Sequence, residues 1–329
     1  MCSNAAMGKA DTDPRQRELS NTDQSDSLDD DEALSLAGED IVIVSPYSSL
    51  KIAAKAWGPL EGRRVLAVHG WLDNCMTWSG LAPYMVRAGF RLVGIDLPGH
   101  GLSDHHPRGN TYEFYSWMVE LFAVADALHW TTFSLLGHSM GASIVAMAAG
   151  LYPERIENLV CIEQFGQWSL PAKYGPKNLQ SHVKAAYALQ LKTPRTYPDI
   201  DAAVEKYKQS NPTMQSYSVR TLLERSTMRT AHGVVFRHDL RMRIPALCRP
   251  TEEMVEEYLR RISCPTLVII GDNGLPFVRA LMDLRRPYMT NVPFQEVVLP
   301  GGHHLHLDSP EVLKDDVIRH LKGIAKAKL

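Results

Sequence analysis

One serine stands where the chain turns sharply from a strand into a helix. Gly137, Ser139 and Gly141 alternate directly after the apolar run 133–136, and small residues dominate from 141 to 150. Such a tight turn needs glycine on both sides, because a side chain would collide with the neighbouring strand or helix. The turn holds the serine in a strained backbone conformation. We therefore predict that Ser139 is a nucleophile.

Attack by a hydroxyl on a carbonyl group places negative charge on the carbonyl oxygen. Two rigid backbone N–H groups aimed at that oxygen stabilise the transition state. Met140 follows the nucleophile directly, and Trp71 lies in the loop after the apolar run 65–68. We predict that Met140 and Trp71 form the oxyanion hole.

A serine nucleophile also needs a base that can return the proton to the leaving group, and histidine suits this role near neutral pH. Of the 13 histidines, His303 follows the last predicted strand and precedes the last predicted helix. We expect it to be the base, with His304 and His306 as alternatives. No histidine and carboxylate lie at ligand spacing in a predicted helix, so we expect no metal and no cofactor.

Strand and helix patterns alternate from about residue 40, which favours a mostly parallel central sheet flanked by helices. We expect the α/β core to comprise residues 39–163 and 262–329. Between them, 164–261 has polar helical stretches without a convincing buried strand, which indicates an inserted helical cap. Residues 1–38 are acidic and polar and predict a disordered tail. The expected strands are 41–44, 50–57, 65–68, 90–95, 133–136, 159–162, 265–270 and 294–299.

Several motifs together resemble the α/β-hydrolase superfamily over about residues 40–326. They are His69-Gly70-Trp71, the run Asp96 to Asp104, the serine turn at 137–141 and Gly302-His303. The stretches 69–74, 236–239 and 271–274 resemble more narrowly the serine hydrolase-like (kraken-type) group. The resemblance implies an α/β-hydrolase fold and a catalytic triad whose acid lies three residues beyond Gly271. That position is Gly274 in this chain, so the acid must come from elsewhere.

Two carboxylates could replace the missing acid. Asp272 follows Gly271 directly, and Glu163 lies at the tip of the strand 159–162. A glutamate at that strand end resembles the arrangement of one haloalkane dehalogenase subgroup. We favour Glu163 because a carboxylate at a strand tip points into the site, and Asp272 remains the alternative. Asp96 resembles a loop-bracing aspartate of the superfamily that accepts backbone hydrogen bonds.

The predicted chemistry is hydrolysis of a small or lipid-derived carboxylic ester or thioester through an acyl-enzyme. Within this superfamily, dehalogenases and epoxide hydrolases attack through an aspartate, so the serine disfavours both. The displaced acid leaves a second hypothesis open: a catalytically inactive binding protein with the same fold. A cofactor-free acyltransferase or peroxidase on the same triad is a third.

Composition and the chain end bear on partners and location. The 35 basic and 37 acidic residues nearly cancel, so no global field favours nucleic acid or an anionic membrane. No run reaches the ~20 apolar residues that a membrane span needs. The five scattered cysteines indicate reduced thiols. Ala327-Lys328-Leu329 resembles a peroxisomal address tag, so we expect a peroxisomal import receptor as partner and a peroxisome-type organelle as location, otherwise the cytoplasm.

Overall fold

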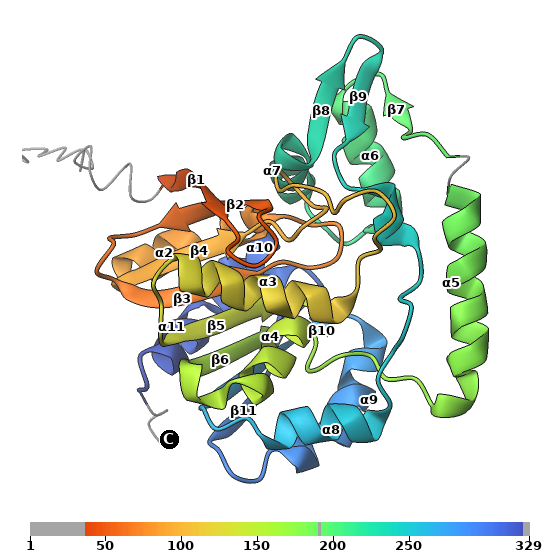
Figure 1. Cartoon of the computed structure of the whole chain (residues 1–329). Coiled ribbons are helices and arrows are strands. Elements are labelled where there is room, and N and C mark those ends of the chain that lie inside the picture. The colour runs from red at the N-terminus through yellow and green to blue at the C-terminus, as the bar shows by residue number, and fades with distance from the viewer. Residues whose placement is uncertain (1–36, 190–191, 325–329) are drawn as a thin grey trace, which may run out of the picture.

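The computed structural model describes residues 37–189 and 192–324 and is built on one eight-stranded sheet (Figure 1). The strand order is β1-β2-β4-β3-β5-β6-β10-β11, and every pairing from β4 to β11 is parallel. Most of the expected tail and the Ala327-Lys328-Leu329 end lie outside the described residues. The strands are β1 Glu39–Val44, β2 Lys51–Trp57, β3 Arg63–Val68, β4 Phe90–Ile95, β5 Phe133–His138, β6 Ile156–Ile162, β10 Thr266–Asn273 and β11 Phe294–Gly302.

Helices cover both faces of this sheet. Side chains alternate between the two faces along each strand, so an entirely apolar strand presents apolar side chains on both sides. In β3, Leu66 and Val68 belong to one apolar cluster, and Val65 and Ala67 belong to the other. The first cluster includes residues of α3 Phe114–Ala127, α4 Met140–Leu151, α8 Glu252–Arg260 and α9 Pro276–Arg285, and the second includes residues of α2 Ala82–Arg87 and α11 Lys314–Leu321. The sheet is therefore buried on both sides, as the continuous apolar runs indicate.

The parallel strands place the predicted functional residues at one edge. The carboxyl ends of β3, β5, β6, β10 and β11 meet there, since neighbouring parallel strands run in register. The loops after β3 and β5 carry Trp71 and Ser139, and Glu163 and His303 directly follow β6 and β11. The topology thus gathers residues that are far apart in the sequence.

The segment between β6 and β10, which we call the insertion (residues 164–261), differs from expectation in two respects. It contains a three-stranded antiparallel sheet of β7 Thr196–Tyr197, β9 Gly233–Phe236 and β8 Thr227–Thr230 beside its helices. Its last helix, α8, packs against α4 of the core. The sequence did not reveal this small sheet because its strands are only two to four residues long, too short to show a clear apolar period.

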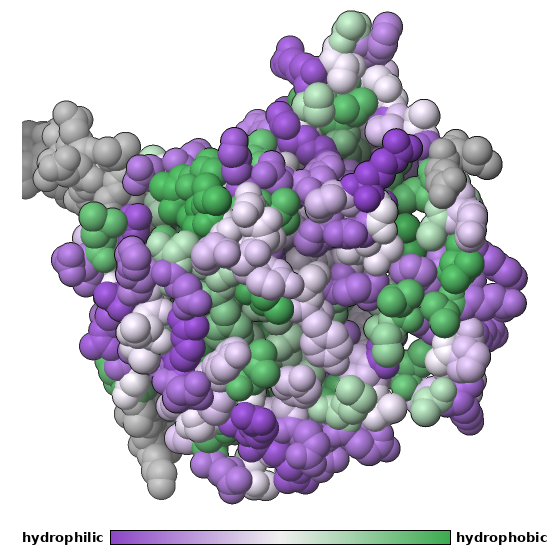
Figure 2. Space-filling model, in the orientation of Figure 1, coloured by the Kyte–Doolittle hydropathy of each residue, from purple (hydrophilic) through white to green (hydrophobic). Residues whose placement is uncertain are grey.

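Three further helices belong to the insertion: α5 Gly175–Leu189, α6 Ile200–Ser210 and α7 Ser216–Ser226. Helices α6 and α7 pack together, whereas α5 stands apart from the central sheet (Figure 1). Figure 2 shows hydrophobic residues gathered along α5. No helix within residues 37–189 and 192–324 is long and apolar enough to cross a membrane.

The close packing of α4 on α8 gives a test of this core. A Cβ added at Gly150 would lie 2.0 Å from the Tyr258 carbonyl oxygen. Gly150→Ala should therefore lower the free energy of unfolding by about 1–3 kcal/mol, measured by urea denaturation. Gly175→Ala is the matched control, because nothing lies within 4 Å of its added Cβ. Equal stability of the two variants would contradict this close packing.

Candidate active site

Ser139 occupies the turn between β5 and α4 in a left-handed backbone conformation. Its φ is 53° and its ψ is −117°, which an L-residue adopts only under strain. Its backbone N–H donates to the Ile162 carbonyl at 2.9 Å. A Cβ at Gly137 would lie 2.5 Å from a Val145 methyl group, and one at Gly141 would lie 2.0 Å from the Val68 carbonyl oxygen. Both glycines are thus required by close contacts, as the sequence spacing predicts.

The two predicted oxyanion donors lie on neighbouring segments. Met140 is the first residue of α4, and the next residue, Gly141, abuts the end of β3. Trp71 lies in the loop that continues from β3. Its side chain is half exposed, and its indole N–H donates to the Met242 carbonyl at 3.3 Å, which ties this loop to the insertion.

The imidazole of His303 is bound to the carboxylate of Glu163. Nδ1 of His303 lies 2.9 Å from Oε2 of Glu163. The carboxylate also accepts the backbone N–H groups of Gly271 at 2.7 Å and Leu275 at 3.0 Å. Because a carboxylate only accepts hydrogen bonds, Nδ1 carries a proton and Nε2 is free to take another. This is the orientation that a base beside a serine nucleophile requires.

The carboxylate of Glu163 occupies the space beside Gly274, the usual position of the acid. A Cβ at Gly274 would lie 2.3 Å from both oxygens of Glu163. Glu163 reaches this place from a left-handed backbone with φ of 61°, at the tip of β6. Glu163 directly follows β6, and Gly274 directly follows the neighbouring strand β10. Together they put a carboxylate where the superfamily pattern puts an aspartate.

Asp272 has a different partner. Its Oδ1 accepts the backbone N–H of Gly301 at 2.9 Å, and the side chain is exposed. This bond holds the end of β11, which leads to His303. The geometry therefore assigns Glu163 to the imidazole and Asp272 to the backbone of β11.

A buried group of polar side chains lies behind His303. Nε2 of His138 donates to the His303 carbonyl at 2.9 Å, and their ring centroids are 4.7 Å apart. Nε2 of His304 lies 3.3 Å from Oδ2 of Asp73, and the hydroxyl of Tyr207 donates to Oδ1 of Asp73 at 3.0 Å. This group joins the serine turn, the His303 loop, the loop after β3 and helix α6.

The pKa values of two histidines of this group are shifted in opposite directions, one by burial and one by a neighbouring charge. Burial lowers the pKa of His138 to about 4. Burial also acts to lower the pKa of His304, but the Asp73 carboxylate raises it above the usual value. His304 is held by Asp73. His306 has a different partner, since its Nε2 lies 2.7 Å from the hydroxyl of Thr77. Neither alternative base is placed as His303 is.

Asp73, His138 and His304 are the residues that could hold a metal ion within the part of the chain that the structure describes. Their ligand atoms lie within 4.8 Å of one another. Oδ2 of Asp73 lies 3.3 Å from Nε2 of His304 and 3.6 Å from Nδ1 of His138.

Sequence reasoning missed Asp73, which lies in the stretch 69–74 used for the resemblance. No spacing rule relates it to His304, 231 residues away. Asp96 fulfils its predicted bracing role. It accepts the backbone N–H groups of Cys75 and Leu102, both at 2.8 Å, and the Arg225 guanidinium at 2.8 Å.

Comparison with known proteins agrees with this geometry. The family model described as "alpha/beta hydrolase fold" matches residues 63–310. The chain belongs to the α/β-hydrolase family. A serine hydrolase-like protein of Dictyostelium discoideum is 32% identical and covers 83% of this chain and 79% of its own. A hypothetical protein of Pseudomonas aeruginosa PAO1 is 34% identical with a TM-score of 0.78, over 87% and 98% of the two chains. A thioesterase domain from the curacin biosynthetic pathway is 25% identical with a TM-score of 0.73, over 85% and 98%.

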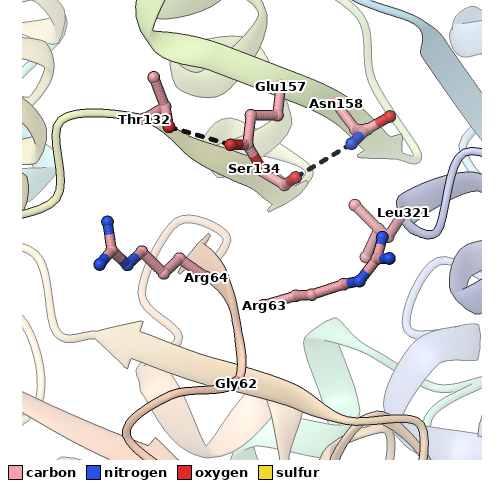
Figure 3. Close-up of a pocket in the computed structure, with 8 residues that line it drawn as sticks. All are labelled: Gly62, Arg63, Arg64, Thr132, Ser134, Glu157, Asn158 and Leu321. Atoms are coloured by element: carbon pink, nitrogen blue, oxygen red, sulfur yellow. Dashed lines mark hydrogen bonds between the residues drawn. The ribbon is translucent and has the colours of Figure 1, made fainter.

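A polar cleft of this α/β-hydrolase lies at the opposite edge of the sheet (Figure 3). It opens at the amino ends of β3, β5 and β6, whereas Ser139 follows the carboxyl end of β5. Thr132 and Glu157 are hydrogen-bonded across it at 2.9 Å, and Asn158 and Ser134 at 3.3 Å. This cleft is therefore separated from Ser139 by the length of the strands.

The buried histidines predict acid sensitivity of the α/β-hydrolase fold. Burial lowers the pKa of both His138 and His238 to about 4, from 6.5. Between these pH values the unfolded chain binds more protons than the folded one, so the free energy of unfolding should fall as the pH falls from 6.5 toward 4. His238→Gln should make this fall shallower in urea titrations, and His232→Gln, at an exposed histidine, should not. An unchanged slope in His238→Gln would contradict the assignment.

Proposed function

We propose that this protein is a serine hydrolase that cleaves a small or lipid-derived carboxylic ester or thioester through an acyl-enzyme. The observation that carries the proposal is the hydrogen bond that Nδ1 of His303 donates to Glu163. The His303 carbonyl is in turn bound by His138, the residue before a serine in a strained turn. Serine hydrolase-like relatives support the general class. One structural relative is a thioesterase domain, which supports thioesters among the substrates.

In the first half of the reaction, the Ser139 hydroxyl attacks the carbonyl carbon and Nε2 of His303 takes its proton. Glu163 stabilises the imidazolium so formed, and the backbone N–H groups of Met140 and Trp71 bind the oxyanion. When the intermediate collapses, the bond to the leaving alcohol or thiol breaks. His303 gives the leaving group the proton, and the acyl group remains on Ser139.

Water then attacks the acyl-enzyme in the second half. His303 takes a proton from the water, the bond to the Ser139 oxygen breaks, and that oxygen recovers the proton. The carboxylic acid is released and the enzyme is restored. The overall change is hydrolysis without oxidation or reduction, so these residues suffice.

The competing hypothesis of an inactive binding protein depends on a missing acid. In the structure, Glu163 is 1% exposed, and both of its carboxylate oxygens accept hydrogen bonds. Burying an ionised carboxylate is costly unless it is fully paired. A binding protein that needs no base would gain nothing from a buried carboxylate paired with His303. The paired Glu163 therefore favours the hydrolase over the inactive binding protein.

Labelling by a fluorophosphonate probe tests the proposal. The protein should be labelled stoichiometrically, and Ser139→Ala should not be labelled. Parallel assays with p-nitrophenyl and thioester acyl substrates of increasing chain length should show turnover that Ser139→Ala loses. An unlabelled protein that folds normally, or labelling that persists in Ser139→Ala, would refute the hydrolase.

The position of the acid is tested by two matched amide variants. Glu163→Gln keeps an oxygen for the Gly271 N–H but removes the charge beside His303, and kcat should fall about 10²- to 10⁴-fold. Asp272→Asn keeps an acceptor for the Gly301 N–H, and kcat should change less than about threefold, since the group does not contact His303. A larger loss in Asp272→Asn than in Glu163→Gln would reverse the assignment.

A further inference from the structure

Positive charge gathers on one part of the insertion. Residues 164–198 contain five basic residues and no aspartate or glutamate, and residues 240–251 contain three basic residues and again none. The whole chain has 35 basic and 37 acidic residues, so the segregation is local. The basic residues are Lys173, Lys177, Lys184, Lys192, Arg195, Arg241, Arg243 and Arg249. Of these, Arg241 is paired with Asp239, which directly precedes the second segment.

Helix α5 carries an exposed apolar stripe beside these charges. Leu179, Val183 and Tyr187 follow one another at intervals of four residues, which places them along one side of the helix. Their exposed fractions are 46%, 43% and 71%. Lys177 and Lys184 are seven residues apart, so they project in nearly the same direction, next to the stripe. Figure 2 shows the hydrophobic residues along this helix.

The side of α5 next to the stripe attaches the helix to the rest of the protein, since Asn178 and His182 directly precede Leu179 and Val183. The Asn178 amide donates to the Ala246 carbonyl at 2.8 Å, and Nδ1 of His182 lies 2.7 Å from the Pro245 carbonyl. These two contacts reach residues 245–246, within the second basic segment. The stripe itself keeps roughly half of its surface exposed beside this attachment.

Two aromatic residues extend the exposed surface before α5 begins. Trp168 and Tyr174 are 44% and 46% exposed. The Arg249 guanidinium lies 5.6 Å from the Trp168 ring, and the Lys173 ammonium lies 5.1 Å from the Tyr174 ring. Tryptophan and tyrosine are the side chains enriched at the boundary between lipid headgroups and acyl chains. We call the surface formed by Trp168, Tyr174, Leu179, Val183, Tyr187, Lys173, Lys177 and Lys184 the α5 face.

We propose that the α5 face docks the protein onto an anionic lipid surface. The apolar stripe enters the headgroup region while the lysines remain at the level of the lipid phosphates, as in other amphipathic helices that lie in the membrane plane. A second copy of this chain would bring like charges together, and an acidic protein surface would not by itself bury the stripe. A lipid surface supplies both negative headgroups and an apolar phase. Docking does not depend on the proposed hydrolysis.

Vesicle sedimentation tests the proposal with the full chain in a Ser139→Ala background, so that no lipid is cleaved. The protein should sediment with phosphatidylcholine vesicles that contain phosphatidylserine and much less with phosphatidylcholine alone, and salt should weaken the binding. Lys177→Gln with Lys184→Gln should reduce the partition coefficient about thirtyfold. Leu179→Ser with Val183→Ser should reduce it about tenfold or more.

The matched control is Met254→Ser with Leu284→Ser, which removes equally exposed apolar residues, 49% and 48%, from other helices. This pair should bind vesicles as the parent does, and circular dichroism should show that every variant is folded. The proposal is overturned if the parent ignores phosphatidylserine or if the control pair also loses binding. It is equally overturned if only the lysine pair matters, or if light scattering shows that the α5 face holds a dimer instead.

Discussion

The arrangement of the site depends on one buried carboxylate. Glu163 lies 140 residues before His303 in the chain, yet its Oε2 is 2.9 Å from Nδ1 of His303. An ionised group can be buried this way only where its lone pairs meet donors, and two backbone N–H groups of β10 and the following loop complete the set. The glycine at 274 is part of the same constraint, because any side chain there would occupy the volume of the carboxylate.

The position of His303 is also coupled to that of Ser139. His138 immediately precedes Ser139 and holds the His303 carbonyl through its ring. A shift of the serine turn would therefore move the backbone that carries the imidazole. Behind this pair, Asp73 connects His304 to Tyr207 of helix α6, so the insertion contacts the polar group that supports the site. Buried polar groups of this kind impose one geometry, since an unpaired member is costly.

The insertion has two differently attached parts. Helix α7 is anchored in the core through Arg225, which bonds to Asp96, and through the Asn74 amide, which donates to the Leu222 carbonyl and the Ser226 hydroxyl. Helix α5 is attached by the Asn178 and His182 hydrogen bonds and by packing against residues 240–244. An element with few buried contacts can present apolar and charged side chains outward without cost to the core.

Local sequence signals determined the parts of this protein whose physics is local. The strand predicted at 90–95 is found at Phe90–Ile95, because a short apolar run between polar residues is sufficient to define a buried strand. The glycines at 137 and 141 define the serine turn for the same reason, since steric exclusion acts over a few residues. The sequence also showed that the usual acid position holds glycine.

Only the tertiary structure decided which carboxylate serves His303 and which residues support it. Asp272 is the nearer candidate to the usual position in sequence, but its oxygen faces a backbone N–H, while Glu163 arrives from the neighbouring strand. Asp73 carried no local signal. The small sheet of the insertion was not visible in the sequence because strands of two to four residues are too short to show an apolar period. These features depend on contacts between residues far apart in the chain, which the sheet topology creates and no local pattern records.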